Sequence, residues 1–291
     1  KILIMLIQVW HHTDYQYSAP VHLGVHKIYL QPQHRPYFRI EHQKVQIEPR
    51  PEGQNFRQDL AGNWYVQSWF SGETRSLEIS TEWIFKLKEF NPFGFILDKT
   101  FEELGWNDPF FQFSYEEKTA FLIPFLKENE EFHFLDFLRE IKKTSSGLVD
   151  FLVNLTQFIH QNWTHQLRQE ENIWEALHTF EAGEGSCRDL ALMQIQMLRE
   201  IGLAARFVSG YAFNPELEEG HELHGWVEVF LPGAGWVGLD PSLGLLTDHH
   251  HIPLASHPNP KRTLPVQGTF SGQAESKLLT RVDIKLLHRS K

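Results

Sequence analysis

The single cysteine of this 291-residue chain, Cys187, lies where the glycine-rich turn GEGS at 183–186 meets a helical pattern. A thiol is a good nucleophile only as a thiolate, and the free N–H groups and partial positive charge of a helix N-terminus lower a thiol pKa. The same N–H groups can bind a developing oxyanion. Cys187 is therefore a candidate nucleophile. The alternative, a small buried side chain like most free cysteines, stays open from this segment alone.

A general base and its orienting carboxylate could come from one hairpin further along the chain. The segments GWVEVF at 225–230 and GWVGLD at 235–240 flank a Gly/Pro turn and are typical of two paired strands. A hairpin centred near Pro232 places His224 opposite Asp240, with Cβ atoms about 5 Å apart. A carboxylate on one imidazole nitrogen fixes the tautomer that a Cys–His nucleophile needs. A register shift of one residue would separate the pair, and each residue alone also suits a strand end or an Asp-Pro turn.

The elements that must position these residues differ between the two halves of the chain. The first ~100 residues have the short alternating patterns and polar turns of an antiparallel β-sandwich. The opening run KILIMLIQVW is shorter than the roughly 20 residues that span a bilayer, and no small-residue cleavage site follows it, so we interpret it as a buried strand. The predicted strands are Ile2–Val9, His22–Leu30, Arg39–Glu48, Asn63–Phe70 and Ser76–Phe85.

The second half begins with helices and returns to strands. The helical patterns cover Phe132–Ile141, Leu148–Trp163, a short helix capped by Asn172, and a helix from Cys187 that buries Leu190, Met193, Met197, Leu198 and Ile201 before a glycine cap at Gly202. Strands follow at Ala205–Phe213, His224–Phe230, Trp236–Asp240 and Leu279–Leu287, with a surface loop from His249 to Pro265. We therefore expect a β-rich N-terminal domain over 1–105 and a catalytic domain over 106–291.

The composition indicates which classes of binding partner and which cellular compartment to expect. The net charge of −10 and the pI near 5.9 argue against a nucleic-acid binder, which usually carries a basic face. One cysteine cannot form an intrachain disulfide, which fits a reducing cytoplasm. We expect a cytoplasmic protein with no membrane partner, no cofactor and no metal. The oligomeric state is not indicated.

The two candidate segments resemble a known family. GSCRDLALMQIQMLREIGLAARFVSGY and HGWVEVFLPGAGWVGLDPSLG resemble the catalytic blocks of the bacterial transglutaminase-like superfamily of cysteine hydrolases, in its Cys, His, Asp order. HHTDYQYSAPVHLGVHKIYLQPQ, AGNWYVQSWF and GTFSG resemble other parts of the same branch, so the resemblance covers nearly the whole chain. Ser186 stands where the family usually has Val, Gly225 where it has Ala, and HPNPKR at 257–262 where it has an acidic segment.

The resemblance implies an α+β protein. Its core would be papain-like, with a cysteine-bearing helix packed on an antiparallel sheet that carries His and Asp. It implies Cys187 as nucleophile, His224 as general base and acid, and Asp240 as orienter. The expected activity is thiol-dependent hydrolysis of a peptide or protein amide through a thioester. Candidate cleft residues are Trp163 and Trp174, as oxyanion donors, and Tyr211 and Trp226, as walls; the alternative for each is an ordinary core aromatic.

Three other functions stay open on the sequence. A protein-glutamine amine transferase would use the same triad but resolve the thioester with an amine. A metal site could use His221, His224 and the run His249–His251, although the Glu of a zinc HExxH motif is absent. A non-enzymatic binding module would follow if His224 and Asp240 lay out of reach of Cys187.

Overall fold

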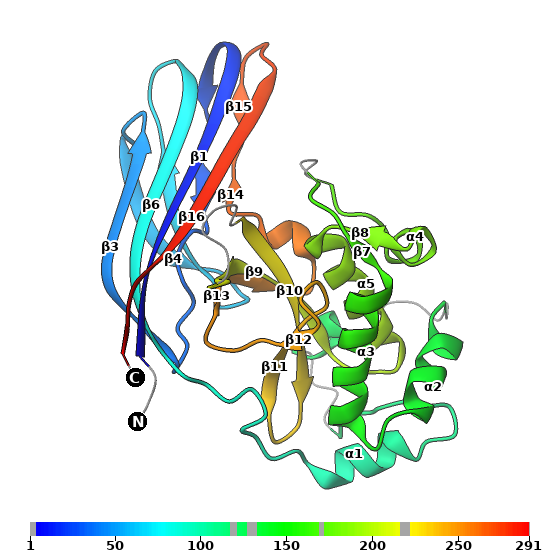
Figure 1. Ribbon diagram of the computed structural model, residues 1–291. Helices are drawn as coiled ribbons and strands as arrows, with labels where there is room; N and C mark the ends of the chain where they lie inside the picture. The colour runs from blue at the N-terminus through cyan, green and yellow to red at the C-terminus, as the bar shows by residue number, and fades with distance from the viewer. Residues whose placement is uncertain (1–3, 117–120, 127–132, 169–171, 216–221, 291) are drawn as a thin grey trace.

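The computed structural model describes residues 4–116, 121–126, 133–168, 172–215 and 222–290 (Figure 1). Its largest strands form one long antiparallel sheet, in which β1 pairs with β6 on one side and with β16 on the other. Every second residue of the first half of β1 is buried, because successive side chains of a strand point to opposite faces. The sheet contains β1 (Ile4–Leu23), β3 (Phe38–Glu48), β6 (Thr74–Lys88), β15 (Phe270–Ser271) and β16 (Ser276–Ser290).

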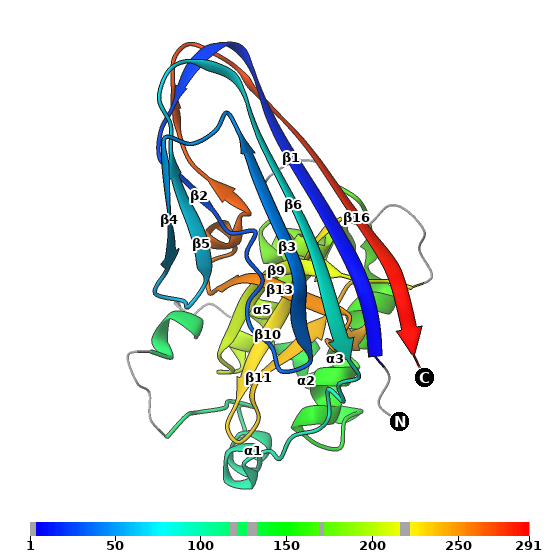
Figure 2. The same cartoon turned by 90° about the vertical axis from the view of Figure 1, so that its left-hand side faces the viewer.

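A second sheet lies beside the long one, as the turned view shows (Figure 2). Ile28 and Val66 of this sheet share a buried apolar cluster with Leu77, Ile79 and Trp83 of β6. The four strands, in sheet order, are β14 (Val266–Gln267), β2 (His26–Ile28), β5 (Trp64–Trp69) and β4 (Gly53–Gln58).

The C-terminal strands pair with N-terminal strands, whereas the sequence led us to expect them within a catalytic domain over 106–291. The closing strand predicted at 279–287 exists as β16, but it pairs with β1 from Ile4↔Ser290 to Tyr17↔Ser276. β14 likewise pairs with β2. The last part of the chain therefore completes the N-terminal sheets instead of belonging to the catalytic region. The alternation of apolar and polar residues predicts that a strand forms, but it does not identify a pairing strand more than 250 residues away.

A third sheet carries the candidate site. Phe207, Val227 and Val229 share the apolar core of the helices, and Tyr211 and Ile252 share the core of the N-terminal sheets. Figure 1 shows this sheet between the long strands and the helices. In sheet order it contains β12 (Leu245–Leu246), β11 (Gly235–Asp240), β10 (Leu223–Leu231), β9 (Ala205–Ala212) and β13 (His251–His257).

The helix that begins at Cys187 follows the sequence prediction closely. α5 (Cys187–Glu200) buries all five residues of the predicted apolar stripe, and Gly202 has the left-handed φ of +79° that a glycine cap needs. No helix in the described ranges is long and apolar enough to cross a membrane. The other helices are α1 (Lys99–Trp106), α2 (Leu135–Lys143), α3 (Leu148–Asn162) and α4 (Ala176–Ala182), with short 3-10 turns at Ile123–Phe125 and Pro260–Thr263 and a two-strand ladder of β7 (Thr164–His165) and β8 (Glu184–Gly185).

Two local predictions were wrong. α4 begins at Ala176 with Glu175 as its N-cap, whereas Asn172 accepts a hydrogen bond from Arg168. The segment predicted as a surface loop contains the buried strand β13. β13 is stabilised by pairing with β9, a partner that a local pattern rich in His and Pro does not reveal.

Candidate active site

Cys187 is the first residue of α5, directly after the N-cap Ser186. The carboxylate of Asp189 accepts hydrogen bonds from the Ser186 backbone N–H (2.8 Å) and hydroxyl (2.6 Å), which closes a capping box around the start of the helix. Cys187 is partly exposed there. The sulfur therefore sits at the electropositive end of a 14-residue helix, where a thiolate is stabilised.

His224 and Asp240 come together across the β10–β11 hairpin. Their Nε2 and Oδ2 atoms lie 2.7 Å apart. The register differs from the predicted one by two residues, because Val227 lies opposite Leu239. An error of two keeps both side chains on the same face, since side chains alternate with a period of two. The predicted contact is therefore present, although the predicted register was wrong.

Asp240 is fully buried and receives several donors besides His224. Its Oδ1 accepts from the Ser242 backbone N–H (3.0 Å), the Ser242 hydroxyl (2.7 Å) and the Leu243 backbone N–H (3.1 Å). Its Oδ2 also faces Nε2 of His251 at 3.1 Å. A buried carboxylate with this many donors is held as an anion in one orientation.

The three groups shift one another's pKa values. Burial raises the pKa of the Cys187 thiol, but the charge of His224 and hydrogen bonds from His165, His224 and the Gly225 backbone bring it down to about 6. Burial opposes charge on His224, yet Asp240 and Cys187 raise its pKa well above the ordinary value. Burial would raise the pKa of Asp240, and His224 and His251 lower it well below its usual range. These pKa shifts favour a Cys187 thiolate, a His224 imidazolium and an Asp240 carboxylate.

His165 is a site residue that sequence reasoning missed. The parallel β7–β8 ladder places His165 opposite Gly185, two residues before Cys187, and His165 is one of the groups that lower the pKa of the thiol. His165 is exposed. Strands of two residues carry no periodicity, so no pattern in the sequence pointed to this contact.

Two regions of the chain match known family models. Residues 7–85 match the bacterial transglutaminase-like N-terminal region, and residues 136–241 match the transglutaminase-like superfamily. The second region contains Cys187, His224 and Asp240. Residues 136–241 belong to the transglutaminase-like superfamily. The chain as a whole has a mixed α/β fold with many antiparallel strands.

Individual relatives of this transglutaminase-like chain are distant. An uncharacterized protein of Mycobacterium tuberculosis strain H37Rv is 25% identical, covering 94% of this chain and 90% of the relative. A protein-glutamine gamma-glutamyltransferase of Pseudomonas aeruginosa is 29% identical over 37% of this chain and 17% of its own length. The crystal structure of a Cytophaga hutchinsonii protein, provisionally named a cysteine protease, superposes with a TM-score of 0.69 and 17% identity over 98% of this chain and 91% of that one. This last likeness shows a shared fold.

The four aromatic residues expected to line a cleft have different surroundings. Trp163 is buried and donates its indole N–H to the Thr179 carbonyl (3.1 Å), so it is not free to bind an oxyanion. The hydroxyl of Tyr211 bonds His11 inside the core that joins the third sheet to the N-terminal sheets. These two predictions were wrong, because both side chains have partners in the interior.

The other two aromatic residues lie closer to the site. Trp226 is buried behind the triad, stacked against the His224 ring with centroids 6.3 Å apart, so it supports the histidine and does not face a cleft. Trp174 is partly exposed and lies against the Arg168 guanidinium, 4.1 Å from the ring centroid. Trp174 as a cleft residue stays a prediction.

Asp189 ties the segment before α4 to the start of the cysteine helix. Besides Ser186, it accepts from the Trp174 backbone N–H (2.7 Å) and from Arg168 (2.7 Å). The Arg168 and Asp189 side chains are only 8% and 0% exposed, so this ion pair is buried. Burial opposes the charge of Asp189, but these hydrogen bonds hold its pKa below the ordinary value.

We expect Asp189→Asn to lower the free energy of unfolding by about 3 kcal/mol at pH 7, because it removes the anionic partner of the buried Arg168 cation. Urea unfolding of wild type and variant measures this difference. Since the folded pKa of Asp189 is depressed, its contribution is complete above the unfolded value of about 4 and is lost as the pH falls through the lower folded value. Asp136→Asn is the matched control, because Asp136 pairs with Arg139 on the surface and is fully exposed. Equal unfolding curves for wild type and Asp189→Asn would contradict the expectation.

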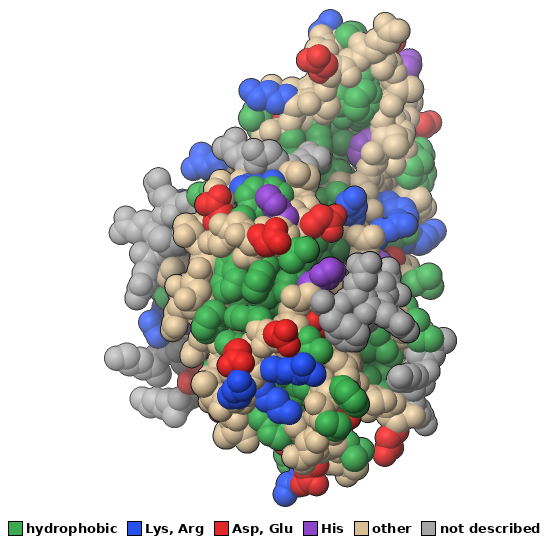
Figure 3. Space-filling model, turned by 90° about the vertical axis from the view of Figure 1, so that its right-hand side faces the viewer, with side chains coloured by type: hydrophobic (Ala, Val, Ile, Leu, Met, Phe, Trp, Pro, Cys, Tyr) green, Lys and Arg blue, Asp and Glu red, His purple; other side chains and the backbone are tan. Residues whose placement is uncertain are grey.

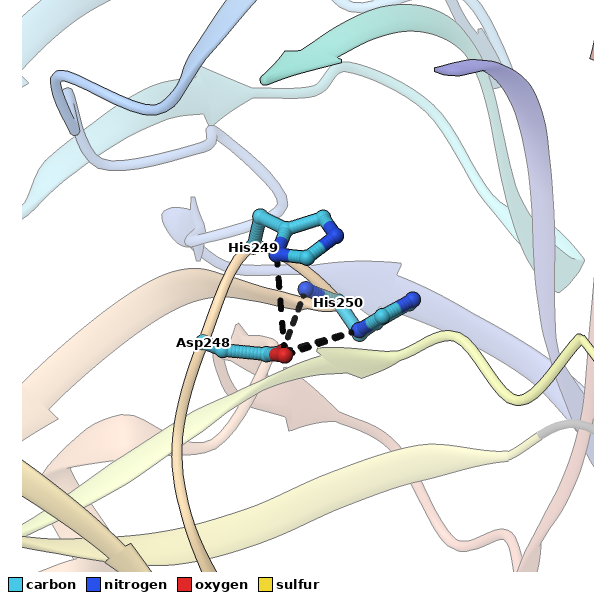
Figure 4. A group of neighbouring side chains, drawn as sticks. All are labelled: Asp248, His249 and His250. Carbon is cyan, nitrogen blue, oxygen red and sulfur yellow. Dashed lines mark hydrogen bonds and ion pairs between the residues drawn. The ribbon is translucent and has the colours of Figure 1, made fainter. Parts of the chain in front are cut away.

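One group of side chains has the composition of a metal site. Oxygen and nitrogen atoms of Asp248, His249 and His250 lie within 4.8 Å of one another (Figure 4). The Nδ1 atom of His250 is 2.9 Å from the Asp248 carboxylate, and Nδ1 of His249 accepts the Phe90 backbone N–H at 3.4 Å. These hydrogen bonds hold the Asp248 carboxylate and the Nδ1 atoms of both histidines, whereas the buried Nε2 atom of His249 has no partner within the described residues. Of the other histidines considered for a metal, His221 lies outside the described residues, and His224 and His251 bond Asp240.

Proposed function

We propose that this protein is a thiol-dependent hydrolase of amide or peptide bonds, with Cys187 as nucleophile, His224 as general base and acid, and Asp240 as orienter. The observation that carries the proposal is the 2.7 Å contact between His224 Nε2 and Asp240 Oδ2, with Cys187 at the N-terminus of α5 and the His224 charge lowering the pKa of its thiol. The same contacts count against an inert binding module. His224 uses Nε2 for Asp240, which leaves Nδ1 to serve the sulfur.

The reaction follows from these protonation states. The Cys187 thiolate forms a bond to the carbonyl carbon, and the carbonyl π electrons move to oxygen to give an oxyanion. As the oxyanion collapses, the C–N bond breaks and the His224 imidazolium gives its proton to the leaving amine, which yields a thioester. Neutral His224 then takes a proton from water as that water attacks the thioester. The C–S bond breaks, the carboxylic acid leaves, and the thiolate–imidazolium pair is restored.

Two groups at the sulfur are suited to stabilise the oxyanion. The Cys187 backbone N–H is in the first turn of α5, where N–H groups have no intrahelical acceptor. His165 brings a second donor to the same sulfur, and it replaces Trp163 as the candidate. We therefore infer an oxyanion site between the helix start and the β7–β8 ladder.

Apolar surface near the site favours an apolar substrate segment. Leu167 follows His165 by two residues and is 71% exposed, and Leu243 and Leu245 are exposed directly after the Asp240 turn. Hydrophobic side chains also gather on the face of the molecule shown in Figure 3. Exposed apolar patches on a soluble protein commonly bind partners or substrates. We propose a peptide or protein amide as the substrate class.

The pH dependence of Cys187 alkylation tests the activated thiol. With iodoacetamide, we expect the rate to rise with a midpoint near pH 6, the pKa that the thiol has beside His224. His224→Gln removes the cation, so its midpoint should move up to the range of a free cysteine, about 8.5. Cys187 is the only cysteine, so the label reports on no other residue. A rate that rises only above about pH 8 in both proteins would overturn the proposal.

The transferase alternative has one specific observation in its favour, the partial match to a protein-glutamine gamma-glutamyltransferase. Both activities share the thioester and differ only in whether water or an amine resolves it. Incubation with a glutamine-bearing protein and a labelled primary amine distinguishes them. Hydrolysis without incorporation of the label supports the hydrolase, and stable incorporation supports the transferase.

A further inference from the structure

A second imidazole contacts the orienting carboxylate. His251, at the start of β13, has its Nε2 atom 3.1 Å from Asp240 Oδ2, the same oxygen that meets His224. His251 is 2% exposed, and its ring packs edge-on against Trp226 with centroids 5.3 Å apart. β13 lies at one end of the third sheet and β11, with Asp240, lies three strands away. The fold therefore brings two histidines from different strands onto one buried oxygen.

The second nitrogen of His251 determines what the first can do. The Asp248 backbone N–H points to His251 Nδ1 at 3.4 Å, and a backbone N–H can only donate. In the neutral ring, Nδ1 must therefore be the acceptor, and the ring proton lies on Nε2, facing Asp240. In the protonated ring Nε2 also carries a proton, and the Asp248 carboxylate, 3.8 Å from Nδ1, lies beside the charge. In both states His251 donates to Asp240.

Asp248 is itself held in place. Its carboxylate accepts from the backbone N–H and the Nδ1 atom of His250, both at 2.9 Å (Figure 4). The chain of contacts therefore runs Cys187, His224, Asp240, His251, Asp248, all in the described part of the protein. The first three members suffice for the proposed chemistry, and the last two remain to be explained.

We propose that His251 is a positioning residue, which donates from Nε2 to Asp240 and fixes that carboxylate against His224. The inference rests on the proposed function of the triad. Asp240 Oδ1 is bound by Ser242 and Leu243, and within the described residues Oδ2 contacts the two histidines. Without His251, Oδ2 is held by one histidine instead of two, so the carboxylate fixes His224 less firmly in the orientation that delivers Nδ1 to the sulfur. The catalytic group is His224, and His251 acts through Asp240.

The test compares His251→Gln with His251→Asn. Gln can place an amide N–H near the position of Nε2, whereas the shorter Asn reaches only the position of Nδ1. Each variant is assayed for turnover of a peptide amide and for alkylation of Cys187 against pH. We expect His251→Asn to lower kcat about 10- to 100-fold with little change in KM, as loss of a supporting hydrogen bond does at other sites. Its alkylation midpoint should rise, and His251→Gln should restore both readouts to near wild type.

Two controls keep the result interpretable. His257→Asn changes a histidine on the same strand, whose Nδ1 accepts the backbone N–H of the nearby Asn259, and it should leave kcat and the midpoint unchanged. Thermal unfolding shows whether each variant folds. Gln and Asn are both polar amides, so the two variants are matched in polarity. Equal loss in both His251 variants, or wild-type kcat in a folded His251→Asn, overturns the positioning role. If wild type itself shows no reactive thiolate, it is the proposed function that fails.

Discussion

Replacing Cys187 with alanine is expected to reduce amide hydrolysis by about 10⁵-fold or more, the scale seen when a covalent nucleophile is removed. The residual turnover should not depend on His224, because a lone imidazole has no thiol to activate. Peptide amide libraries and a denatured protein substrate supply the assay. Cys187 is small and at the helix start, so the thermal unfolding midpoint should stay close to that of wild type.

The covalent intermediate gives this prediction a second readout. Wild type mixed with an activated acyl donor should gain the mass of one acyl group, and neutral hydroxylamine should remove it, because it cleaves thioesters. The alanine variant should gain no mass. Activity that persists in Cys187→Ala, or an acyl group on another residue, would show that the chemistry lies elsewhere.

The triad could be predicted because each part depends on local sequence. A cysteine at the first position of an amphipathic helix follows from Gly183, Gly185 and the apolar stripe to Ile201. The His–Asp contact follows from one tight hairpin, and an even register error leaves its geometry intact. The resemblance to a family added the order of the three residues. The matching family models confirm the superfamily itself.

The supporting residues could not be predicted because they depend on distant parts of the chain. β13 is an edge strand with Pro253 at an irregularity in its pairing with β9, and such positions tolerate proline. Taken alone, a run of histidines before a proline-rich segment resembles a loop. Only the tertiary position of β13 makes His251 a neighbour of Asp240. His165 is similar, since its contact with Cys187 depends on a ladder two residues long.

In the N-terminal sheets, too, local patterns could be predicted from the sequence, whereas features that depend on distant strands could not. Alternation of apolar residues identified most strands, but β1 continues to Leu23 through a polar stretch that the prediction left out. β6 and β16 flank this stretch and complete its backbone hydrogen bonds, while the buried side chains of His11 and Thr13 bond each other and His11 bonds the Tyr211 hydroxyl. The burial of His11 lowers its pKa to about 4, so this ring stays neutral at physiological pH.

Asp240→Asn is expected to reduce kcat by about 10³- to 10⁴-fold while leaving the fold intact, because an amide in this position imposes the wrong tautomer on His224. The orientation of the new amide follows from its neighbours. Two backbone N–H groups, of Ser242 and Leu243, face the Oδ1 position and favour an oxygen there, against the single donor that His251 directs at the Oδ2 position. The amide nitrogen then takes the Oδ2 position, where it meets Nε2 of His224 and loses the hydrogen bond from His251.

An amide N–H at that position can only donate, so Nε2 of His224 must accept and the ring proton moves to Nδ1. A neutral ring of this form cannot take a proton from the thiol, and the imidazolium has lost its counter-charge. The alkylation midpoint of Cys187 should therefore rise well above 6, in parallel with the loss of kcat. Asp240→Glu keeps the charge with a displaced carboxylate and should lose less activity than Asp240→Asn. If the amide variant matched wild type in both measurements, His224 would not depend on Asp240 for its tautomer, and a Cys–His pair alone would have to account for the reactivity of the thiol.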